Sequence, residues 1–168
     1  MDIAIKTDYV RANDLMEKAK NAERHSYFRS PDYFTAASFY ERAAVNFKIA
    51  DDLKSAAAAY IEAARCRLNF DGRKSLIADN YKSACEILFE LNEPKIVDIL
   101  KKSIEIYLDE GSLYSAGNCR TMIGKFLMKN NRTDDAISEY KLAEKYFKCC
   151  GSHLDAVECS KIIANAEK

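Results

Sequence analysis

The side chains best able to do chemistry in this 168-residue chain are two histidines, six cysteines and several paired acids. Cys149-Cys150 and His153 surround one predicted turn, but these three groups lack the fourth ligand and the spacing of a zinc site. The pairs Asp51-Asp52 and Asp134-Asp135 stand at predicted helix starts, where negative charge complements the helix dipole. Helix ends therefore explain these residues better than a metal centre or acid–base catalysis does.

Sequence motifs of catalysis and cofactor binding are missing. The chain has no GxxxxGK[ST] loop for phosphates, no GxGxxG for dinucleotides and no GxSxG around a nucleophile. His25 and His153 both fall near predicted helix ends, where a lone histidine is commonly solvated or a cap. The cysteines show no CxxC spacing, so we expect reduced thiols in or near a core. We predict a protein that is not an enzyme, with no catalytic residues, cofactor or metal.

Composition narrows the class of protein further. The 26 basic and 26 acidic residues cancel, whereas proteins that bind nucleic acid carry a basic excess, so we expect no nucleic-acid partner. No apolar run approaches the roughly 18 residues of a membrane span, and the charged N-terminus is unlike a signal peptide. We therefore expect a cytoplasmic protein.

A repeat with a period of 20 residues is the most informative feature. Apolar and small residues recur at i, i+4, i+7 and i+11, which marks one face of a helix. The segments read Ala36-Tyr40-Ala43-Phe47, Ala56-Tyr60-Ala63-Arg67, Ile77-Tyr81-Ala84-Leu88, Ile96-Leu100-Ser103-Tyr107, Ala116-Arg120-Ile123-Leu127, Ala136-Tyr140-Ala143-Phe147 and Ala156-Ser160-Ile163. An earlier segment, about Asp8 to His25, has similar spacing.

These segments predict about eight helices joined by short turns. Ser30-Pro31 and Thr133 are expected near helix starts, and Gly111 and Gly151 suit helix ends. One helix per 20 residues gives antiparallel pairs that bury their apolar faces only by stacking. We therefore predict an all-α fold, a right-handed superhelical solenoid like that of tetratricopeptide repeats. It forms a single domain over residues 1–168, with a flexible start at about 1–7 and a loop at about 26–32.

The loop between the first two predicted helices is the first candidate binding element. Tyr27 and Phe28 fall outside the helical template and are followed by Arg29. Aromatic and basic residues together on a loop are typical of contact with a membrane surface or a partner groove. The alternative is a hydrophobic staple that covers the first helix junction.

Cations spaced by the repeat are the second candidate. Lys101, Arg120 and Lys141 are about 20 residues apart, so a solenoid can align them as a stripe that binds an acidic partner. The alternative is an ordinary solvated surface.

Three stretches, residues 30–48, 103–111 and 134–140, resemble the soluble NSF attachment proteins, the SNAP family. The first, with Pro31-Asp32-Tyr33 and an AASFYERAAVNFK string, is most similar to the γ-type. The second, SIEIYLDEG, is similar to the α-type, and the third resembles the family's seventh helix. The likeness extends in order over nearly the whole chain.

The resemblance implies an adaptor that grips the SNARE four-helix bundle and recruits the NSF ATPase to disassemble it during vesicle fusion. It also implies peripheral membrane contact through the loop that holds Tyr27 and Phe28. The family grips SNAREs with lysines on its sixth and eighth helices, and this chain has Asn118 and Glu158 there. Family members continue into a C-terminal bundle that meets the ATPase, so we expect recruitment only where such a half exists.

A second function remains open from the residues alone. Stacked helix pairs of this kind also form tetratricopeptide-like scaffolds that bind other helices or peptides, unrelated to SNAREs.

Overall fold

The computed structural model describes residues 3–24, 30–70 and 74–167. Helices make up 85% of these described residues and no strand occurs among them, which confirms the all-α prediction. The described part of the chain contains eight helices, the number that the repeat predicts. They form two compact units, Met1–Leu91 and Asn92–Lys168. A single domain over residues 1–168 and the hand of the superhelix stay predictions.

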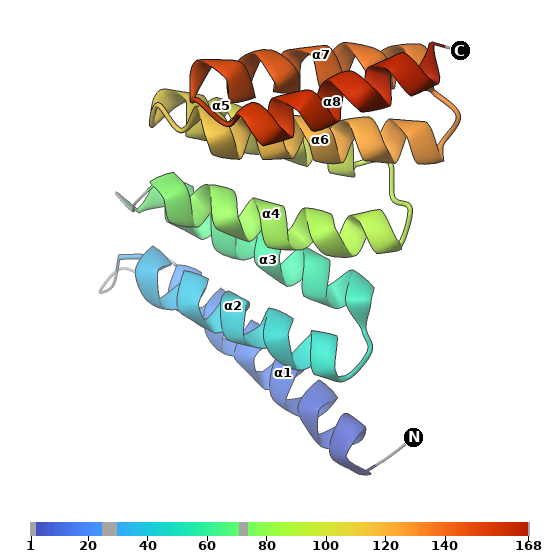
Figure 1. Cartoon of the computed structure of the whole chain (residues 1–168). Coiled ribbons are helices and arrows are strands. Elements are labelled where there is room, and N and C mark those ends of the chain that lie inside the picture. The colour runs from blue at the N-terminus through green and yellow to red at the C-terminus, as the bar shows by residue number, and fades with distance from the viewer. Residues whose placement is uncertain (1–2, 25–29, 71–73, 168) are drawn as a thin grey trace. The chain divides into compact units, whose positions relative to one another are not determined.

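The first unit holds α1 to α4, and each helix packs against the next in antiparallel order (Figure 1). The bounds are Ile3–Glu23 for α1, Tyr33–Ile49 for α2, Leu53–Asn69 for α3 and Lys74–Glu90 for α4. Helix α1 begins at Ile3, within the start at about 1–7 whose flexibility stays a prediction. Residues 3–7 contain no Pro or Gly to stop the helix earlier.

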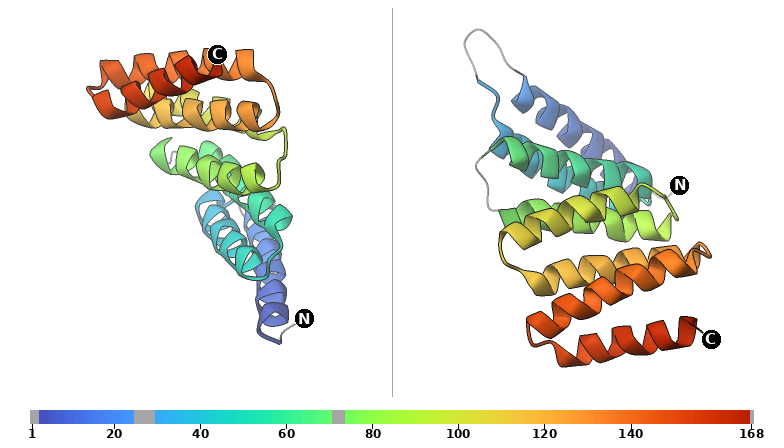
Figure 2. Two further views of the ribbon diagram at one scale, coloured as in Figure 1. Left: turned by 45° about the vertical axis from the view of Figure 1, so that its right-hand side comes forward. Right: turned by 90° about the horizontal axis from the view of Figure 1, so that it is seen from above.

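The second unit holds α5 to α8, again with each helix packed against its neighbour in the chain (Figure 2). The bounds are Ile96–Asp109 for α5, Leu113–Lys129 for α6, Thr133–Cys149 for α7 and His153–Ala166 for α8. Both units are therefore stacks of antiparallel helices, as the 20-residue repeat predicts.

Left-handed residues at the ends of four helices explain the regular period. Positive φ angles occur at Asp51 (61°), Gly111 (73°), Asn131 (59°) and Gly151 (79°), which follow α2, α5, α6 and α7. After each, the next backbone N–H donates to the carbonyl five residues back, as from Ser152 to Phe147 at 2.8 Å. This is the Schellman arrangement, which satisfies the last carbonyls of a helix and turns the chain sharply.

The helix starts differ from the sequence prediction at two places. The side chain of Asp32, rather than Ser30, caps α2 by accepting from the Thr35 N–H at 3.0 Å. Asp52 caps α3 in the same way, through Ser55 at 3.1 Å. Thr133 is the first residue of α7 rather than its cap. An aspartate is the stronger cap at α2, because its charge also complements the helix dipole.

The core consists mainly of alanines, aromatic rings and thiols. In the first unit Tyr40 and Cys66 are buried among the alanines of α1 to α3. Cys85, Cys119 and Cys159 are also buried, which confirms the prediction of core thiols for four of the six cysteines. Cys149 and Cys150, at the end of α7, are exposed. Alanine lets neighbouring helices approach closely, and the larger rings fill the space that remains.

A partly buried carboxylate links three helices of the first unit. Glu23 at the end of α1 accepts from the Tyr40 hydroxyl of α2 at 2.6 Å and from the Arg65 guanidinium of α3. Burial acts to raise the pKa of Glu23, but the hydrogen bonds from Tyr40 and Arg65 outweigh it and hold this pKa below its usual value. Glu23 is therefore charged at neutral pH and fixes the end of α1 that precedes residues 24–32.

Candidate functional site

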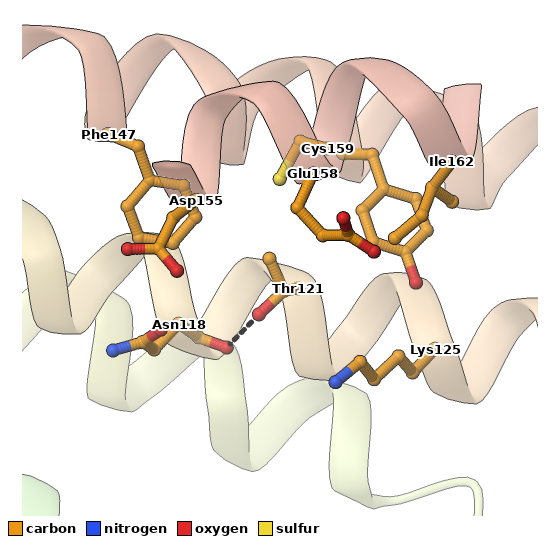
Figure 3. A pocket seen from close by; sticks show the side chains of 9 residues that line it. Asn118, Thr121, Lys125, Phe147, Asp155, Glu158, Cys159 and Ile162 are labelled. Atoms are coloured by element: carbon orange, nitrogen blue, oxygen red, sulfur yellow. Dashed lines mark hydrogen bonds between the residues drawn. The ribbon is translucent and has the colours of Figure 1, made fainter. Parts of the chain in front are cut away.

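The clearest hollow of the second unit is a groove between α6 and α8 that is also lined by side chains of α7 (Figure 3). Its cavity volume is about 150 Å³, comparable to one or two side chains. The lining residues are Asn118, Thr121, Lys125, Tyr140, Phe147, Asp155, Glu158, Cys159 and Ile162. We call this feature the α6–α8 groove.

Two glycines of α6 set the depth of the groove floor. A Cβ atom on Gly117 would lie 2.8 Å from Cε1 of Phe147, and one on Gly124 would lie 2.9 Å from Cε2 of Tyr140. Both rings belong to α7 and are buried. Glycine inside a helix is about 1 kcal/mol less favourable than alanine. The packing of the two rings against α6 offsets this loss of helix stability. The aromatic floor exists because α6 has no side chain at these two positions.

The two walls carry different charges. On α6, Asn118, Thr121 and Lys125 follow one another along one face; on α8 the corresponding residues are Asp155, Glu158 and Ile162. Figure 3 shows Asp155 above Asn118, Glu158 above Thr121, and Lys125 below Ile162. The α8 wall is therefore acidic where the α6 wall is an amide and a hydroxyl, and the one amine lies farther along.

The thiol in the groove is not poised for catalysis. Burial raises the pKa of Cys159 to about 11, and the carboxylates of Glu144, Asp155 and Glu158 act in the same direction against Lys125. The thiol is therefore protonated at neutral pH and is a poor nucleophile. No group of three or more residues able to hold a metal occurs in the described part of the chain.

A second hollow, of about 180 Å³, lies between α5 and α7 above α6. Its lining includes Val97 and Lys101 of α5, Ile123 and Leu127 of α6, and a polar edge from α7: Asp135, Ser138 and Glu139, with Arg132 just before that helix. This α5–α7 groove has an aliphatic floor and charges of both signs at its rim.

The three predicted cations have different surroundings, and their alignment as a stripe stays a prediction. Lys101 lies in the α5–α7 groove. Arg120 donates to Glu139 at 2.7 Å, and its guanidinium lies 5.3 Å from the centre of the Tyr146 ring. Lys141 instead donates to Glu167 beyond α8 at 3.2 Å. Burial alone would lower the pKa of Arg120, but the bonds to Tyr146 and Glu139 raise it. Arg120 is thus a charged group already neutralised inside the unit.

Tyr27, Phe28 and Arg29 lie outside the described residues, so the loop prediction is not tested. Close to this segment in sequence, Phe34 at the start of α2 packs on Phe70 after α3, with ring centres 5.5 Å apart. These rings are 59% and 43% exposed. The repeat template did not indicate this pair, because both rings lie outside the template positions and Phe70 follows the end of α3 in an extended conformation.

Asn118 and Glu158, the two departures from the family's lysines, line the same α6–α8 groove. The sequence contains part of the information that indicates this groove. Gly117 and Gly124 occupy repeat positions where other segments have alanine, such as Ala37 and Ala44, and a glycine inside a helix indicates close approach.

These features define a helical-repeat protein: stacked antiparallel helices, two shallow grooves and a neutral buried thiol. Among the described residues, no helix is long and apolar enough to cross a membrane. Residues 10–168 match the family model for soluble NSF attachment proteins, SNAP. The chain therefore belongs to the SNAP family, a family of non-enzymatic adaptors built as tetratricopeptide-like helical solenoids. A search of curated protein sequences returned no match.

Proposed function

We propose that this protein is an adaptor that binds assembled SNARE four-helix bundles for disassembly by an NSF-type ATPase in vesicle fusion and intracellular protein transport. The observation that carries the proposal is the SNAP family match over residues 10–168. The helical grooves support it, because side-chain ridges on a helix bundle pack into hollows of this kind. We propose no catalytic step for the chain itself.

The proposed binding residues are Lys101 and Lys141, with Arg120 in a supporting role. Lys101 and Lys141 are exposed and present amines to solvent. Arg120 orients Glu139 at the rim of the α5–α7 groove, beside Lys101. A bundle with acidic surface residues would meet these amines, and salt would screen the contacts within about 10 Å at 0.1 M.

The direct test is a pull-down with the purified chain as bait. We expect retention of the assembled four-helix bundle and little retention of the same SNARE helices presented singly. Lys101→Glu/Lys141→Glu should weaken retention at low salt, and Glu105→Lys is a charge-changing control on the exposed face of α5. Equal retention of assembled and single helices would contradict an adaptor that recognises the bundle.

We also propose a cytoplasmic location with peripheral contact on membranes through Tyr27, Phe28 and Arg29. The exposed Phe34–Phe70 pair supports this, because it adds aromatic surface beside the same stretch of sequence. A few exposed rings contribute only a few kcal/mol at a membrane interface, so binding would be weak and reversible. Liposome flotation of Tyr27→Ser/Phe28→Ser should show reduced binding. Unchanged flotation would remove this element from the proposal.

Recruitment of the ATPase forms a separate part of the proposal. In the described residues the repeat continues through Ala156 and Ile163 of α8 without a different kind of element. We propose that the ATPase is recruited only where a C-terminal half of the kind implied by the family resemblance exists. In an ATP-dependent disassembly assay with this chain as sole adaptor, we expect no turnover. Turnover like that of a longer family member would place the recruiting surface within α1 to α8.

A tetratricopeptide-like scaffold that binds another helix is the second candidate. The observation that favours it is the acidic α8 wall, Asp155 and Glu158, which is unsuited to an acidic bundle. The same pull-down distinguishes the two, because such a scaffold would not prefer the assembled SNARE bundle.

A further inference from the structure

The polar walls of the α6–α8 groove have no partners across the groove. The Thr121 hydroxyl donates within its own helix, to the Asn118 carbonyl at 2.8 Å. Among the described residues, the Lys125 amine and the Asn118 side-chain amide have no hydrogen bond or ion pair. Glu158 has only Lys161 of its own helix, at 4.0 Å, and its side chain is 66% exposed. The charges that face the hollow are therefore available to a molecule that enters it.

The equivalent place in the first unit is closed by internal bonds. Glu41 and Arg67 stand four repeat periods of 20 before Thr121 and Phe147. The α4 segment is shifted by one residue in the repeat, so Asn80 corresponds to Cys159 of α8. There the Glu41 carboxylate of α2 accepts from Arg67 of α3 at 2.7 Å and from Asn80 of α4 at 2.8 Å. One residue thus links α2 directly to α4. Thr121 is too short to make the corresponding link, so the open groove is a local property of the second unit.

The spacing on both walls matches a helix as the occupant. The wall residues follow i, i+3, i+7 on α6 (118, 121, 125) and on α8 (155, 158, 162). Such ridges accept the side chains of a helix laid between them. At 1.5 Å per residue the groove spans about 10 Å, or two turns of an incoming helix. The aromatic floor of Tyr140 and Phe147 supplies apolar contact below.

We propose that the α6–α8 groove binds a helical segment of a partner that places a Lys or Arg side chain against Asp155 and Glu158. The aliphatic part of that side chain covers the aromatic floor while its charge meets the carboxylates. Farther along, Lys125 favours a carboxylate on the same partner helix. The segment is therefore bipolar, with its cation and its acid in a fixed order along the groove. Asp155 also accepts from Ser152, which holds this carboxylate in place.

This inference goes beyond the proposed function and does not depend on it, because it holds for any helical partner. It differs from the lysine-based contact that the family resemblance implies at these positions. In this chain a purely acidic helix would meet two carboxylates and be repelled. The test therefore uses helices of defined charge rather than a SNARE bundle.

The probes are three synthetic amphipathic helices of about 18 residues, identical except for Lys, Gln or Glu at one central contact position. Binding to the full chain is measured by fluorescence anisotropy at low salt. We expect the Lys helix to bind about tenfold more tightly than the Glu helix, with the Gln helix between them. Raising the salt to 0.5 M should reduce the differences in affinity among the three helices.

The decisive variant is Glu158→Lys, at an exposed position where folding should not suffer. This substitution should weaken binding of the Lys helix and strengthen binding of the Glu helix, so that the order of their affinities reverses or disappears. Glu105→Lys changes the net charge equally on α5 and should leave the order as in the parent. Unfolding temperatures of both variants check that each remains folded. Amide chemical shifts should move along residues 118–125 and 155–162.

Four outcomes of these binding experiments would count against the proposal. No binding of any helix at millimolar concentration, equal affinities for all three, an order unaffected by Glu158→Lys, or shifts confined to other helices would overturn it. Failure of the SNARE pull-down with normal Lys-helix binding would instead reject only the SNARE adaptor. Success of the pull-down with no helix selectivity would reject only the bipolar groove.

Discussion

The two units use the same repeat positions for opposite purposes. Across α2 to α4, Arg67, Glu41 and Asn80 form a hydrogen-bonded link in which one carboxylate oxygen accepts from two helices. Four repeat periods later, Phe147 replaces the arginine and Thr121 replaces the glutamate. The first unit is closed by polar bonds at this place, whereas the second unit has an aromatic floor with a hollow above it.

The small residues beneath these side chains also differ between the two units. Ala37 and Ala44 of α2 are fully buried, and Gly117 and Gly124 occupy the equivalent positions of α6. Removing two methyl groups lets the rings of α7 lie directly on the α6 backbone. The comparison indicates that a shallow binding surface can arise from a repeat through loss of a linking carboxylate and of two methyl groups, with no change of fold.

The largest predicted effect comes from the aromatic floor. Phe147 is 1% exposed, so Phe147→Ala should lower the free energy of unfolding by about 3–5 kcal/mol through lost burial and a cavity. Arg67→Ala at the equivalent place should cost only about 1–3 kcal/mol, because Asn80 still donates to Glu41. Urea denaturation of both variants measures the difference. Equal losses would show that the two places are energetically alike.

The next effect concerns the Glu23 carboxylate of the first unit and how its contribution to stability depends on pH. Glu23→Gln should lower the free energy of unfolding by about 2 kcal/mol at pH 7, because a charged acceptor of two side chains becomes a neutral one. The pKa of Glu23 is depressed in the folded state, so its contribution is present above about pH 5 and is lost as pH falls through the folded-state pKa.

Urea titrations of the parent and Glu23→Gln at pH 7 and at about pH 3 measure this contribution. The gap between the two proteins should narrow as the pH falls. A gap that is constant with pH would mean that Gln disturbs the packing rather than the charge. Glu105→Gln, on an exposed face of the second unit, is the matched control and should change stability little at either pH.

The glycines of α6 provide a smaller but sharper test. Gly117→Ala gains about 1 kcal/mol of helix propensity but places Cβ against Phe147, where overpacking costs about 1–3 kcal/mol. We expect a net loss of about 1 kcal/mol. In a Phe147→Leu background the clash is relieved, so the same change should be neutral or stabilising. A double-mutant cycle by urea denaturation measures the coupling, and additivity would contradict the close approach.

The sequence predicted the repeat well because helix period, small residues and turn residues all recur every 20 positions. Gly111 and Gly151 marked helix ends correctly, and Cys66 and Cys159 were correctly expected in the core. The cation stripe was harder to predict. A spacing of 20 residues does not say which neighbour a long side chain reaches, and Arg120 turns to Glu139 of the next helix.

The groove itself could be predicted only in part. Gly117 and Gly124 indicated a close approach inside α6, but not which rings would use it. Those rings, Tyr140 and Phe147, follow the same template as every other segment. Their role depends on contacts between helices, and these appear only once α6, α7 and α8 are packed together. The helix bounds and core were therefore readable from local patterns, whereas the site depends on pairs of residues distant in sequence.

The smallest expected effect compares two ion pairs, one from each unit. Lys141 and Glu167 lie 3.2 Å apart with side chains 58% and 52% exposed, whereas the Arg67–Glu41 pair is largely shielded. Solvent screens the exposed pair, and ordering two long side chains costs entropy, so Lys141→Gln should change the free energy of unfolding by less than about 0.5 kcal/mol. If Lys141 contacts an acidic partner, its loss will appear in binding and not in stability. Urea denaturation together with bundle retention at low salt separates these roles. A stability loss above about 1 kcal/mol would mean that the pair holds the end of α8 on α7, and Lys141 would then be a structural residue like Arg67.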